Sequence, residues 1–263
     1  MPLEAPLPPV AERAAELNRR YRHHGATAVL ARALSDPLVG RIALVSSFGA
    51  ESVVLLHLIS VMDRTTPVVF IDTEMLFAET LDYQSDLAGR LGLTDVRRVT
   101  PAADTVAAED PGQTLHLTDK DACCALRKTR PLQQALSGFD AWITGRKRFQ
   151  SGDRATLEFF ESEAGARIKV NPLAHWAPED VREYMVENRL PRHPLVARGY
   201  PSIGCAPCTS PVAEGEDPRA GRWRGDDKTE CGIHFVNGKM VRGPLSGGRN
   251  EGPNEGPNEG MMI

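Results

Sequence analysis

The sequence predicts an α/β protein with a doubly wound, mostly parallel sheet and helices on both faces. Short apolar runs of strand length alternate along the chain with longer amphipathic stretches of helix length. The first two runs are each followed directly by such a stretch, which is the order of strand–helix–strand units and therefore of a parallel sheet. Because open parallel sheets bind ligands at the carboxyl ends of their strands, we expect the site there.

Four apolar runs are expected to form buried strands. The first, RIALVSS, ends in small polar residues, and the second, TPVVFIDT, is rich in branched apolar residues. Continuous apolar runs of this length are typical of strands that are covered on both faces. The expected strands lie at 41–47, 66–73, 95–101 and 141–146.

Longer amphipathic stretches are expected to form helices. A helical segment follows a proline-rich start, one helix follows each of the first two strands, and Gly92 ends the second of these helices. A further helix, entered through a proline and a pair of acidic residues, follows residue 170. The expected helical regions lie at 1–35, 50–63, 75–92 and 171–191.

The chain divides by composition into four parts. The tail GGRNEGPNEGPNEGMMI repeats GPNE and holds almost nothing to bury, so we expect it to be disordered. Glycine, proline and loop signals dominate the stretch that precedes it. The expected parts are an N-terminal helical segment at 1–35, a main domain at 36–215, a flexible C-terminal segment at 216–245 and the disordered tail at 246–263.

Composition and charge exclude several classes of protein. The 263 residues are 41% hydrophobic and 25% charged, which is ordinary for a soluble globular protein. No run of about 18 apolar residues occurs, so we expect no membrane span. A net charge of −4 argues against a nucleic-acid partner. The start of the chain does not read as a secretory signal, and we therefore expect a cytoplasmic protein.

The stretch SSFGAES lies between an expected strand and an expected helix. Its small residues let the backbone approach a ligand, and the following helix offers free N–H groups, which suits phosphate. It is neither a Walker A loop nor GxGxxG. Alone it favours phosphate binding only slightly over an ordinary turn. The candidate binding residues are Ser46, Ser47, Phe48, Gly49 and Ser52.

This loop resembles the SGGxDS pattern of the PP-loop (adenine nucleotide alpha hydrolase-like) superfamily. The resemblance implies that superfamily's architecture and a nucleotide pocket. Phe48 stands in place of a glycine and Glu51 in place of the aspartate, and both departures argue against ATP pyrophosphatase chemistry. A third departure is Glu74 in IDTEMLFAET, where the superfamily has DTG. Glu74 is expected to add charge or bulk near the nucleotide.

Four of the five cysteines form two close pairs, Cys123–Cys124 and Cys205–Cys208. Adjacent cysteines are poorly placed for a mutual disulfide because disulfide geometry is narrow. They are also cramped as ligands of one zinc ion, whereas each could bind a different iron of a cluster. The chemistry therefore favours a 4Fe–4S cluster over zinc. A redox dithiol at the CxxC pair is a further alternative, which leaves the adjacent pair unexplained.

The fifth cysteine, Cys231, stands alone in the polar stretch DDKTECGIHF. A cysteine in such a stretch becomes a nucleophile if positive charge lowers its pKa. The candidates for that charge are Lys228, His234 and the upstream Arg219, Arg222 and Arg224. Without further information, an unreactive surface thiol is the better interpretation of Cys231.

Several motifs occur in a characteristic order between residues 40 and 235: SSFGAES, CCALRKTRPL, TGRKRFQSGDR, KVNPLAHW, GYPSIGCAPCTSPV, RAGRW and KTECGIH. Together they resemble the assimilatory adenylyl-sulfate reductases, the iron–sulfur branch of the PAPS/APS reductase family. PAPS reductases resemble this branch but typically keep only the final cysteine.

The resemblance implies an enzyme of sulfate assimilation and cysteine biosynthesis. Residues 36–215 would be its nucleotide-binding reductase domain and 216–245 its mobile catalytic segment. A 4Fe–4S cluster would be bound by Cys123, Cys124, Cys205 and Cys208. The Cys231 thiolate would attack adenosine 5′-phosphosulfate (APS) and form an S-sulfocysteine. A thioredoxin or glutaredoxin-like dithiol would then release sulfite.

The resemblance also implies a set of substrate-binding cations. Lys128 would lie between cluster and substrate, and Arg219 and Arg222 in RAGRW would face the phosphosulfate. His234 joins them as a candidate, while Arg146 and Lys147 in TGRKR are weaker ones. For Lys147 and Arg148 a solvated surface charge is equally expected.

Two other functions compete with APS reduction within this family and superfamily: reduction of 3′-phosphoadenylyl sulfate (PAPS), and tRNA thiolation by a PP-loop enzyme. The negative net charge argues against the second. A zinc-binding interaction module is a third, non-enzymatic alternative. The oligomeric state, including a homo-oligomer, is left open by the sequence.

Overall fold

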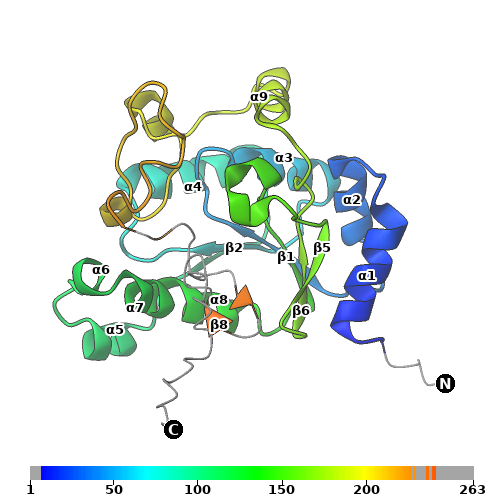
Figure 1. Ribbon diagram of the computed structural model, residues 1–263, viewed down its shortest axis with the longest axis horizontal. Coiled ribbons are helices and arrows are strands. Elements are labelled where there is room, and N and C mark those ends of the chain that lie inside the picture. The colour runs from blue at the N-terminus through cyan, green and yellow to red at the C-terminus, as the bar shows by residue number, and fades with distance from the viewer. Residues whose placement is uncertain (1–6, 227, 229–234, 237–238, 241–263) are drawn as a thin grey trace, which may run out of the picture.

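The computed structural model describes residues 7–226, 228, 235–236 and 239–240, and its centre is a six-stranded sheet (Figure 1). The strand order is β3-β2-β1-β4-β6-β5, and every pair is parallel except β5–β6. The four predicted strands are confirmed as β1 to β4. The strands are β1 (Ile42–Ser46), β2 (Val68–Ile71), β3 (Val96–Val99), β4 (Ala141–Ile143), β5 (Phe160–Glu163) and β6 (Arg167–Val170).

The order of the strands sets the position of the site. From β1 the chain moves outward through β2 to β3 and then returns to the other side of β1 to form β4. The crossover direction therefore reverses between β1 and β4. In open α/β sheets a ligand crevice forms at the carboxyl ends of the strands at such a switch point. The predicted doubly wound, mostly parallel sheet is confirmed.

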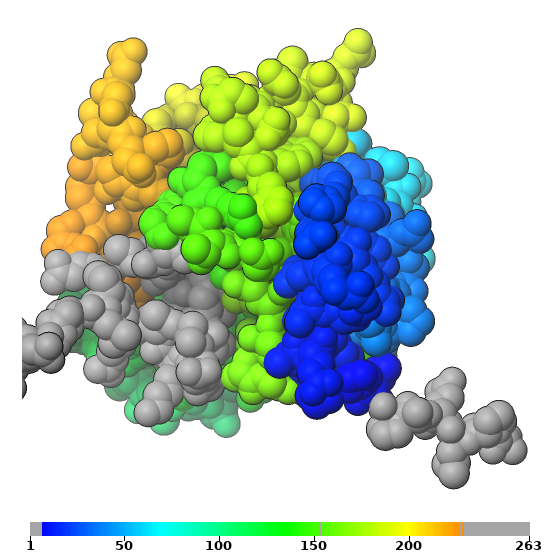
Figure 2. All heavy atoms as spheres, turned by 45° about the vertical axis from the view of Figure 1, so that its right-hand side comes forward, coloured from blue at the N-terminus to red at the C-terminus, as the bar shows by residue number. Residues whose placement is uncertain are grey.

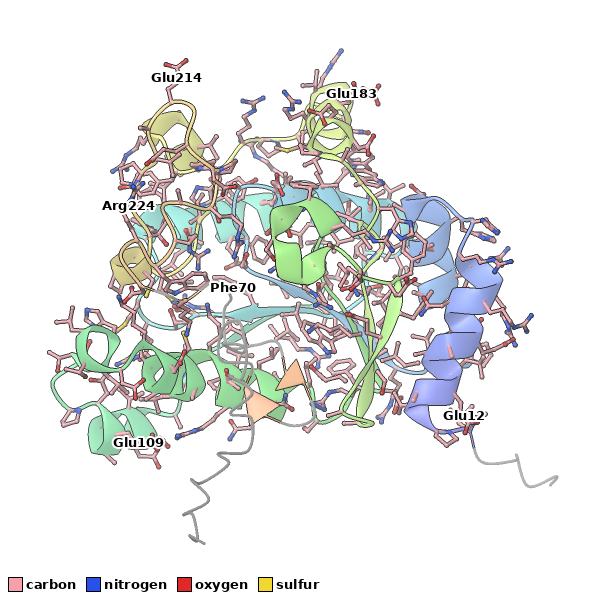
Figure 3. All side chains as sticks on the ribbon, in the orientation of Figure 1. Glu12, Phe70, Glu109, Glu183, Glu214 and Arg224 are labelled. Atoms are coloured by element: carbon pink, nitrogen blue, oxygen red, sulfur yellow. The ribbon has the colours of Figure 1, made fainter. Side chains whose placement is uncertain are left out.

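Both faces of the sheet are buried, as the continuous apolar strands require. In β2, Val68 and Phe70 join the larger core, whereas Val69 and Ile71 join the smaller one on the opposite face. Figure 3 shows Glu183 of α9 and Glu109 of α5 on opposite sides of the sheet. The longer helices are α1 (Val10–Tyr21), α2 (Ala26–Ala33), α3 (Ser52–Met62), α4 (Ala78–Leu91), α5 (Ala103–Glu109) and α9 (Pro178–Glu187).

The connection from β3 to β4 holds several short helical segments. After α5 come α6 (Leu115–Thr118), α7 (Lys120–Cys124), the π-helical turn η1 (Ala125–Thr129) and α8 (Arg130–Ala135). Asp119 begins α7, since its carboxylate accepts hydrogen bonds from the backbone N–H groups of Asp121 and Ala122. The remaining short turns are η2 (Arg148–Gln150), η3 (Gly152–Arg154), η4 (Pro194–Arg198) and η5 (Ala206–Cys208).

The hairpin of β5 and β6 was not predicted from the sequence, and it forms the edge of the sheet. Helix α1 covers that edge: the Asn18 side chain donates to the Phe160 carbonyl at 2.7 Å and accepts from the Phe160 N–H at 3.0 Å. This protects an edge strand that would otherwise expose backbone groups. Figure 2 shows the two N-terminal helices, in blue, against this side of the molecule.

Two expectations need adjustment. The helix expected at 171–191 is shorter, because α9 begins only at Pro178, which occupies the first helical turn where a missing N–H costs nothing. The expected helical region 1–35 is divided into two helices, with Gly25 before the second. The division of the chain into four parts stays a prediction, and the tail 246–263 lies outside the described residues. Strands β7 (Phe235–Val236) and β8 (Lys239–Met240) form a separate two-stranded sheet.

In the described part of the chain, the helices are all too short or too polar to cross a membrane.

Candidate active site

The loop 46–52 leaves the carboxyl end of β1 and enters α3. Its hydroxyl groups order the backbone: Ser46 Oγ accepts from the Phe48 N–H at 3.2 Å, and Ser52 Oγ accepts from the Gly49 N–H at 3.1 Å. The Ser47 and Ser52 hydroxyls lie 3.4 Å apart. A side chain at Gly49 would crowd Ser47 Oγ and the Ile203 carbonyl at 3.3–3.4 Å. The conformation of this loop is therefore fixed by its own serine hydroxyls and by the close approach of its backbone to Ile203.

This loop forms one wall of the larger cavity, which has a volume of about 310 Å³. That volume is at the lower end of the range for small-molecule sites. Among the predicted loop residues, Ser46, Ser47, Gly49 and Ser52 line it. Phe48 is fully buried in the core instead, with its ring edge-to-face on Phe70 at 5.2 Å between centroids.

Phe48 adopts a left-handed backbone conformation, with φ of 48°. The glycine of the SGGxDS pattern would adopt it without strain, whereas a non-glycine residue there costs roughly 1–2 kcal/mol. Burial of a whole phenylalanine side chain contributes more than that. With Phe48 in place of glycine, the loop therefore carries backbone strain, and burial of the phenylalanine ring offsets that strain.

Cations are concentrated around the larger cavity. The lining residues include the carboxylates of Glu51 and Asp217 and six basic side chains, Lys128, Arg146, Lys147, Arg154, Arg219 and Arg222. This excess of positive charge at the carboxyl ends of parallel strands suits a polyanionic ligand such as a nucleotide.

Lys147 is buried, so the expectation of a solvated surface charge is wrong for this residue. Its side chain is 2% exposed, and Nζ donates to Glu51 Oε2 at 2.8 Å and to the Gly145 carbonyl at 3.1 Å. Burial lowers the pKa of Lys147, and the neighbouring Glu51 carboxylate opposes that change. Arg148, by contrast, is partly exposed and contacts Glu158 at 3.5 Å. Glu51, the second departure from the pattern, thus anchors a buried cation.

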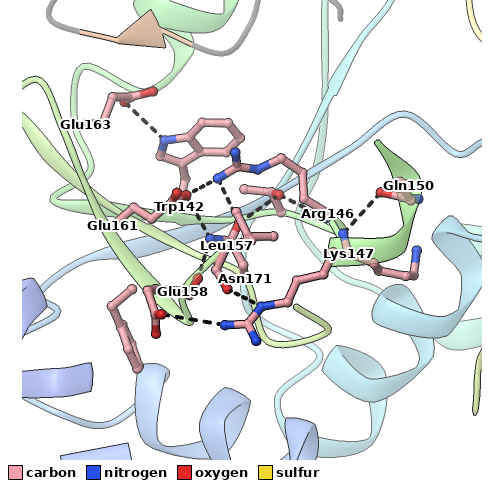
Figure 4. A network of polar contacts seen from close by, with 12 residues as sticks. Trp142, Arg146, Lys147, Gln150, Leu157, Glu158, Glu161, Glu163 and Asn171 are labelled. Atoms are coloured by element: carbon pink, nitrogen blue, oxygen red, sulfur yellow. Dashed lines mark hydrogen bonds and ion pairs between the residues drawn. The ribbon is translucent and has the colours of Figure 1, made fainter. Parts of the chain in front are cut away.

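Arg146 is held by a polar network from the β5–β6 hairpin (Figure 4). Its Nη2 donates to the Glu161 carboxylate and, at 3.0 Å, to Asn171 Oδ1. Asn171 is fully buried and donates through Nδ2 to Glu161 Oε2 at 2.9 Å. Sequence reasoning missed Glu161 and Asn171 because the hairpin itself was missed; the alternating pattern of 160–170 was the available signal.

A second, smaller cavity of about 20 Å³ is lined by four thiols. Cys123 and Cys124 come from the end of α7, and Cys205 and Cys208 come from the turn around η5. The Ala206 N–H donates to the Met75 carbonyl at 2.7 Å, which fastens that turn to the segment after β2. The two cysteine pairs, about 80 residues apart in sequence, thus line the same cavity.

All four of these cysteines are free thiols. Burial raises the pKa of Cys123 to about 11, with a further contribution from Cys205, and burial followed by Cys205 raises the pKa of Cys208. Cys205 Sγ lies 3.2 Å from the Thr73 hydroxyl, and Cys124 Sγ lies 3.7 Å from Lys228 Nζ. Within the described residues, no group of three or more His, Cys, Asp or Glu side chains is arranged to hold a single metal ion.

Two nitrogen atoms in the wall of the cysteine cavity are buried and lack a hydrogen-bond partner among the described residues. They are His116 Nδ1 and Arg127 Nε. The remaining nitrogens of Arg127 are bound, since Nη2 donates to Asp110 Oδ2 at 3.0 Å and Nη1 to the Thr73 carbonyl at 3.3 Å. Arg127 and Asp110 are each about 2% exposed.

Glu74 lies on the cysteine side and is absent from the residues that line the larger cavity. Its Oε2 lies 3.5 Å from Arg127 Nη1, and its backbone is left-handed with φ of 59°. We expected Glu74 to add charge near the nucleotide. Its carboxylate instead contacts Arg127, which lines the cysteine cavity.

The two cavities meet at Lys128, which lines both. Next to it, a side chain at Gly204 would lie 2.3 Å from Arg222 Nη2, so the glycine leaves room for that guanidinium. Arg222 also stacks on the Trp223 ring at 4.5 Å, and its buried Nε has no hydrogen-bond partner in the described part of the chain. Gly221 allows close approach as well, because a Cβ there would meet the Ser210 carbonyl at 2.1 Å. RAGRW therefore packs directly on the cysteine-bearing turn.

Two predicted site residues, Cys231 and His234, lie outside the described residues. Lys228, which precedes them, donates to the Asp121 carboxylate beside the cysteine cavity.

Comparisons with known proteins agree with this geometry. The sequence model of the phosphoadenosine phosphosulfate reductase domain matches residues 41–211. A protein of Mesorhizobium japonicum named adenosine 5′-phosphosulfate reductase is 50% identical over 226 residues, 86% of this chain and 89% of the relative.

Solved structures give the same result for the fold. A phosphoadenylyl-sulfate reductase from Candida auris, solved as a phosphate complex, has a TM-score of 0.65 and 28% identity over 76% of this chain and 97% of that chain. Yeast FAD synthetase shares the fold alone, with a TM-score of 0.50 and 16% identity over 77% of this chain and 75% of that one. The predicted architecture is confirmed, and this chain belongs to the phosphoadenosine phosphosulfate reductase family.

Proposed function

We propose that this protein reduces APS to sulfite and AMP in sulfate assimilation. The observation that carries the proposal is the pair of adjoining cavities, one lined by cations and one by four thiols, with Lys128 in the wall of both. The relative from Mesorhizobium japonicum, which is named for this activity, supports the same conclusion.

The larger cavity would bind the nucleotide. The serine hydroxyls and the backbone of the loop 46–52 would contact the adenylate, with Arg146 on the same wall. Lys128, Arg219 and Arg222 would face the phosphosulfate, since all three line the larger cavity, Lys128 also lines the cysteine cavity, and Arg222 packs against Gly204 of the cysteine-bearing turn. The buried, unpartnered Nε of Arg222 supports an anionic ligand there, because an unpaired buried N–H is costly. His234 completes the proposed substrate-binding set.

Cys123, Cys124, Cys205 and Cys208 would bind a 4Fe–4S cluster. The donor set fits this group: four thiols line one cavity, and thiolates are the usual ligands of such clusters. Two buried nitrogens in the same wall have no hydrogen-bond partner among the described residues, which fits a cavity that contains a bound group. When bound, the cluster would supply local charge and rigidity, since the dithiol donor provides both electrons of the reaction.

The reaction itself would proceed through Cys231. Its thiolate attacks the sulfur of APS, an S–S bond forms, and the bond from that sulfur to the bridging oxygen breaks, so AMP leaves with the electron pair. Lys128, Arg219 and Arg222 would stabilise the charge that develops on the departing phosphate. A thiolate of the donor then attacks Cys231 Sγ and sulfite leaves. The second thiol of the donor frees Cys231 and completes a disulfide.

The proposal also covers the dithiol donor, the cellular compartment, the C-terminal segment and the oligomeric state. Thioredoxin or a glutaredoxin-like protein would be the dithiol donor, and the protein would act in the cytoplasm, where free thiols persist. The segment 216–245 would carry the nucleophile to the cavity. A homo-oligomer stays an open prediction.

Reduction of PAPS is the second candidate, favoured by the likeness to the Candida auris reductase. The two functions differ in the 3′-phosphate of the substrate, and the four cavity cysteines favour APS by resemblance to the iron–sulfur branch. The tRNA thiolase and zinc-module alternatives lose their support now that the family is established.

The test is thioredoxin-dependent sulfite release from APS and from PAPS, measured side by side on anaerobically purified protein. We expect release from APS and little from PAPS. Equal or greater release from PAPS would favour the second candidate. Release from neither, with iron-loaded protein and active thioredoxin, would contradict both.

A further inference from the structure

The wall of the cysteine cavity contains a histidine for which the proposed reaction has no role. His116 lies in the short helix α6, and it lines the cavity together with the four cysteines. Its Nδ1 atom is buried, and no hydrogen-bond partner for it exists among the described residues. Leu117 and Thr118 of this helix are exposed, whereas Leu115 and His116 are half-buried, and of these two only His116 lines the cavity.

A buried polar nitrogen without a partner is unusual. Such an atom destabilises the folded protein relative to a hydrogen-bonded one, and most buried polar groups in native proteins are paired. Because Nδ1 belongs to the wall that also carries the four thiols, the partner it lacks is one that the cavity would contain. An N–H group facing sulfur ligands can donate to a cysteine sulfur or to a bridging sulfide.

The position of His116 is fixed by a buried ion pair. The Asp110 carboxylate binds Arg127 at 3.0 Å and also accepts from the Leu115 N–H at 3.0 Å, at the start of α6. The Asp119 N–H then donates to the Leu115 carbonyl at 2.8 Å, and Asp119 in turn begins α7. The turn that carries His116 and the helix that carries two of the thiols are thus held by one continuous set of bonds.

We propose that His116 is a positioning residue that donates an Nδ1–H hydrogen bond to a sulfur of the cluster held by the four cysteines. This inference rests on the proposed cluster. A hydrogen bond to sulfur spreads the negative charge of the cluster, which favours its more reduced state and strengthens its retention. His116 therefore raises the reduction potential and slows the loss of iron.

His116 gives a cleaner test than Arg127, which also has an unpartnered nitrogen. Replacement of Arg127 would leave the buried Asp110 carboxylate without its cation, and loss of one partner of a buried ion pair is strongly destabilising. No hydrogen bond or ion pair of His116 is lost on substitution within the described structure.

The experiment compares His116→Leu, which lacks a donor, with His116→Asn, whose amide can place an N–H near the position of Nδ1. His23→Leu is the matched control, since His23 is exposed and lies two residues after the end of α1, and Figure 1 shows α1 and α6 on opposite sides of the molecule. Iron content, the resonance Raman spectrum in H₂O and D₂O, and the reduction potential are measured for each protein, and so is iron release to a chelator.

We expect His116→Leu to lose part of the D₂O shift of the Fe–S stretching bands and to have a lower potential. It should also release iron about tenfold faster. His116→Asn should restore most of each property, and His23→Leu should match the wild type. If the wild type binds iron and the His116→Leu variant has the same spectrum, reduction potential and rate of iron release, this inference is overturned and the cluster proposal stays intact. A wild type that binds no iron after anaerobic reconstitution would overturn both.

Discussion

The two cavities that share Lys128 are built in different ways. The larger one lies at the ends of parallel strands, and its cations Arg146 and Lys147 are bound to the carboxylates of Glu161 and Glu51. The smaller one is formed by short helical turns, and its cation Arg127 is bound to the fully buried Asp110. The difference matches two kinds of occupant. A substrate that enters and leaves needs space and positive charge, whereas a resident group needs closely spaced ligands held by a rigid frame.

The largest expected effect separates the two cavities by function. Cys231→Ser should lower sulfite release by a factor of roughly 10³ or more, because no thiolate remains to attack, while iron content stays at the wild-type level. Cys123→Ser should lose most of the iron and, through Lys128, the activity as well. Sulfite release and iron per chain are measured on the same samples. Full iron occupancy in Cys123→Ser, or iron loss in Cys231→Ser, would contradict the division of roles.

The second prediction compares a left-handed residue beside each cavity. Phe48, in the loop of the larger cavity, is buried, whereas Gln113, just before α6, is exposed and has φ of 52°. Phe48→Gly relieves strain but removes a buried ring, so the free energy of unfolding should fall by roughly 2–4 kcal/mol. Gln113→Gly removes backbone strain without removing a buried side chain, so it should raise the free energy of unfolding by up to about 1 kcal/mol. Urea denaturation measures both; equal effects would show that burial of Phe48 contributes nothing.

The third prediction concerns the charge behind the larger cavity. Lys169 is buried on the Trp142 ring at 4.6 Å, and burial, with the nearby Arg146, lowers its pKa to about 7. The unfolded pKa is about 10.4, so between pH 7 and 10 the unfolded chain binds one proton more than the folded one. Stability from this group therefore rises with pH across that window.

Lys169→Met removes this dependence. From pH 7 to pH 9 the wild type should gain about 1–2 kcal/mol of unfolding free energy relative to the variant. Urea denaturation at both pH values provides the measurement. A difference between wild type and variant that stays constant with pH would mean that Lys169 titrates normally in the folded protein.

The smallest expected effect lies where the cavities meet. In Gly204→Ala the new methyl group would displace the Arg222 guanidinium, the flexible end of a side chain, so stability should change little. Loss of one charge-assisted contact should raise KM for APS about tenfold. Gly138→Ala is the control, because a Cβ at that position meets nothing within 4 Å. An unchanged KM would remove Arg222 from the proposed binding set.

Much of the fold was predictable because its signals are local. The four apolar runs became β1 to β4, and the small residues of SSFGAES became a turn at the end of β1. The hairpin of β5 and β6 escaped prediction because its strands carry charged residues, such as Glu161 and Lys169, on positions that tertiary contacts bury or pair. Local pattern gives no sign of a charge that becomes buried.

The sequence predicted which types of residue form the candidate site, but it did not predict which of them contact one another. The paired cysteines indicated a shared site by their chemistry, and the structure brings them together. Lys147 was equally expected at the surface, since nothing in TGRKR distinguishes it from Arg148; its burial follows from Glu51, 96 residues earlier. The support of the cysteine cavity by Asp110, Arg127 and Glu74 was also not visible, because these residues meet only in the folded chain.

The sequence by itself determined the α/β class, the phosphate-type loop, the two cysteine pairs and the concentration of basic residues in a few short motifs. These features depend on periodicity and on residue chemistry over distances of a few residues. Only the tertiary structure decided which cations are buried against carboxylates and that Phe48 belongs to the core. Those outcomes depend on burial and on contacts between residues from 15 to 96 positions apart. The energy of a buried charge is set by the groups around it in space and not by its neighbours in sequence.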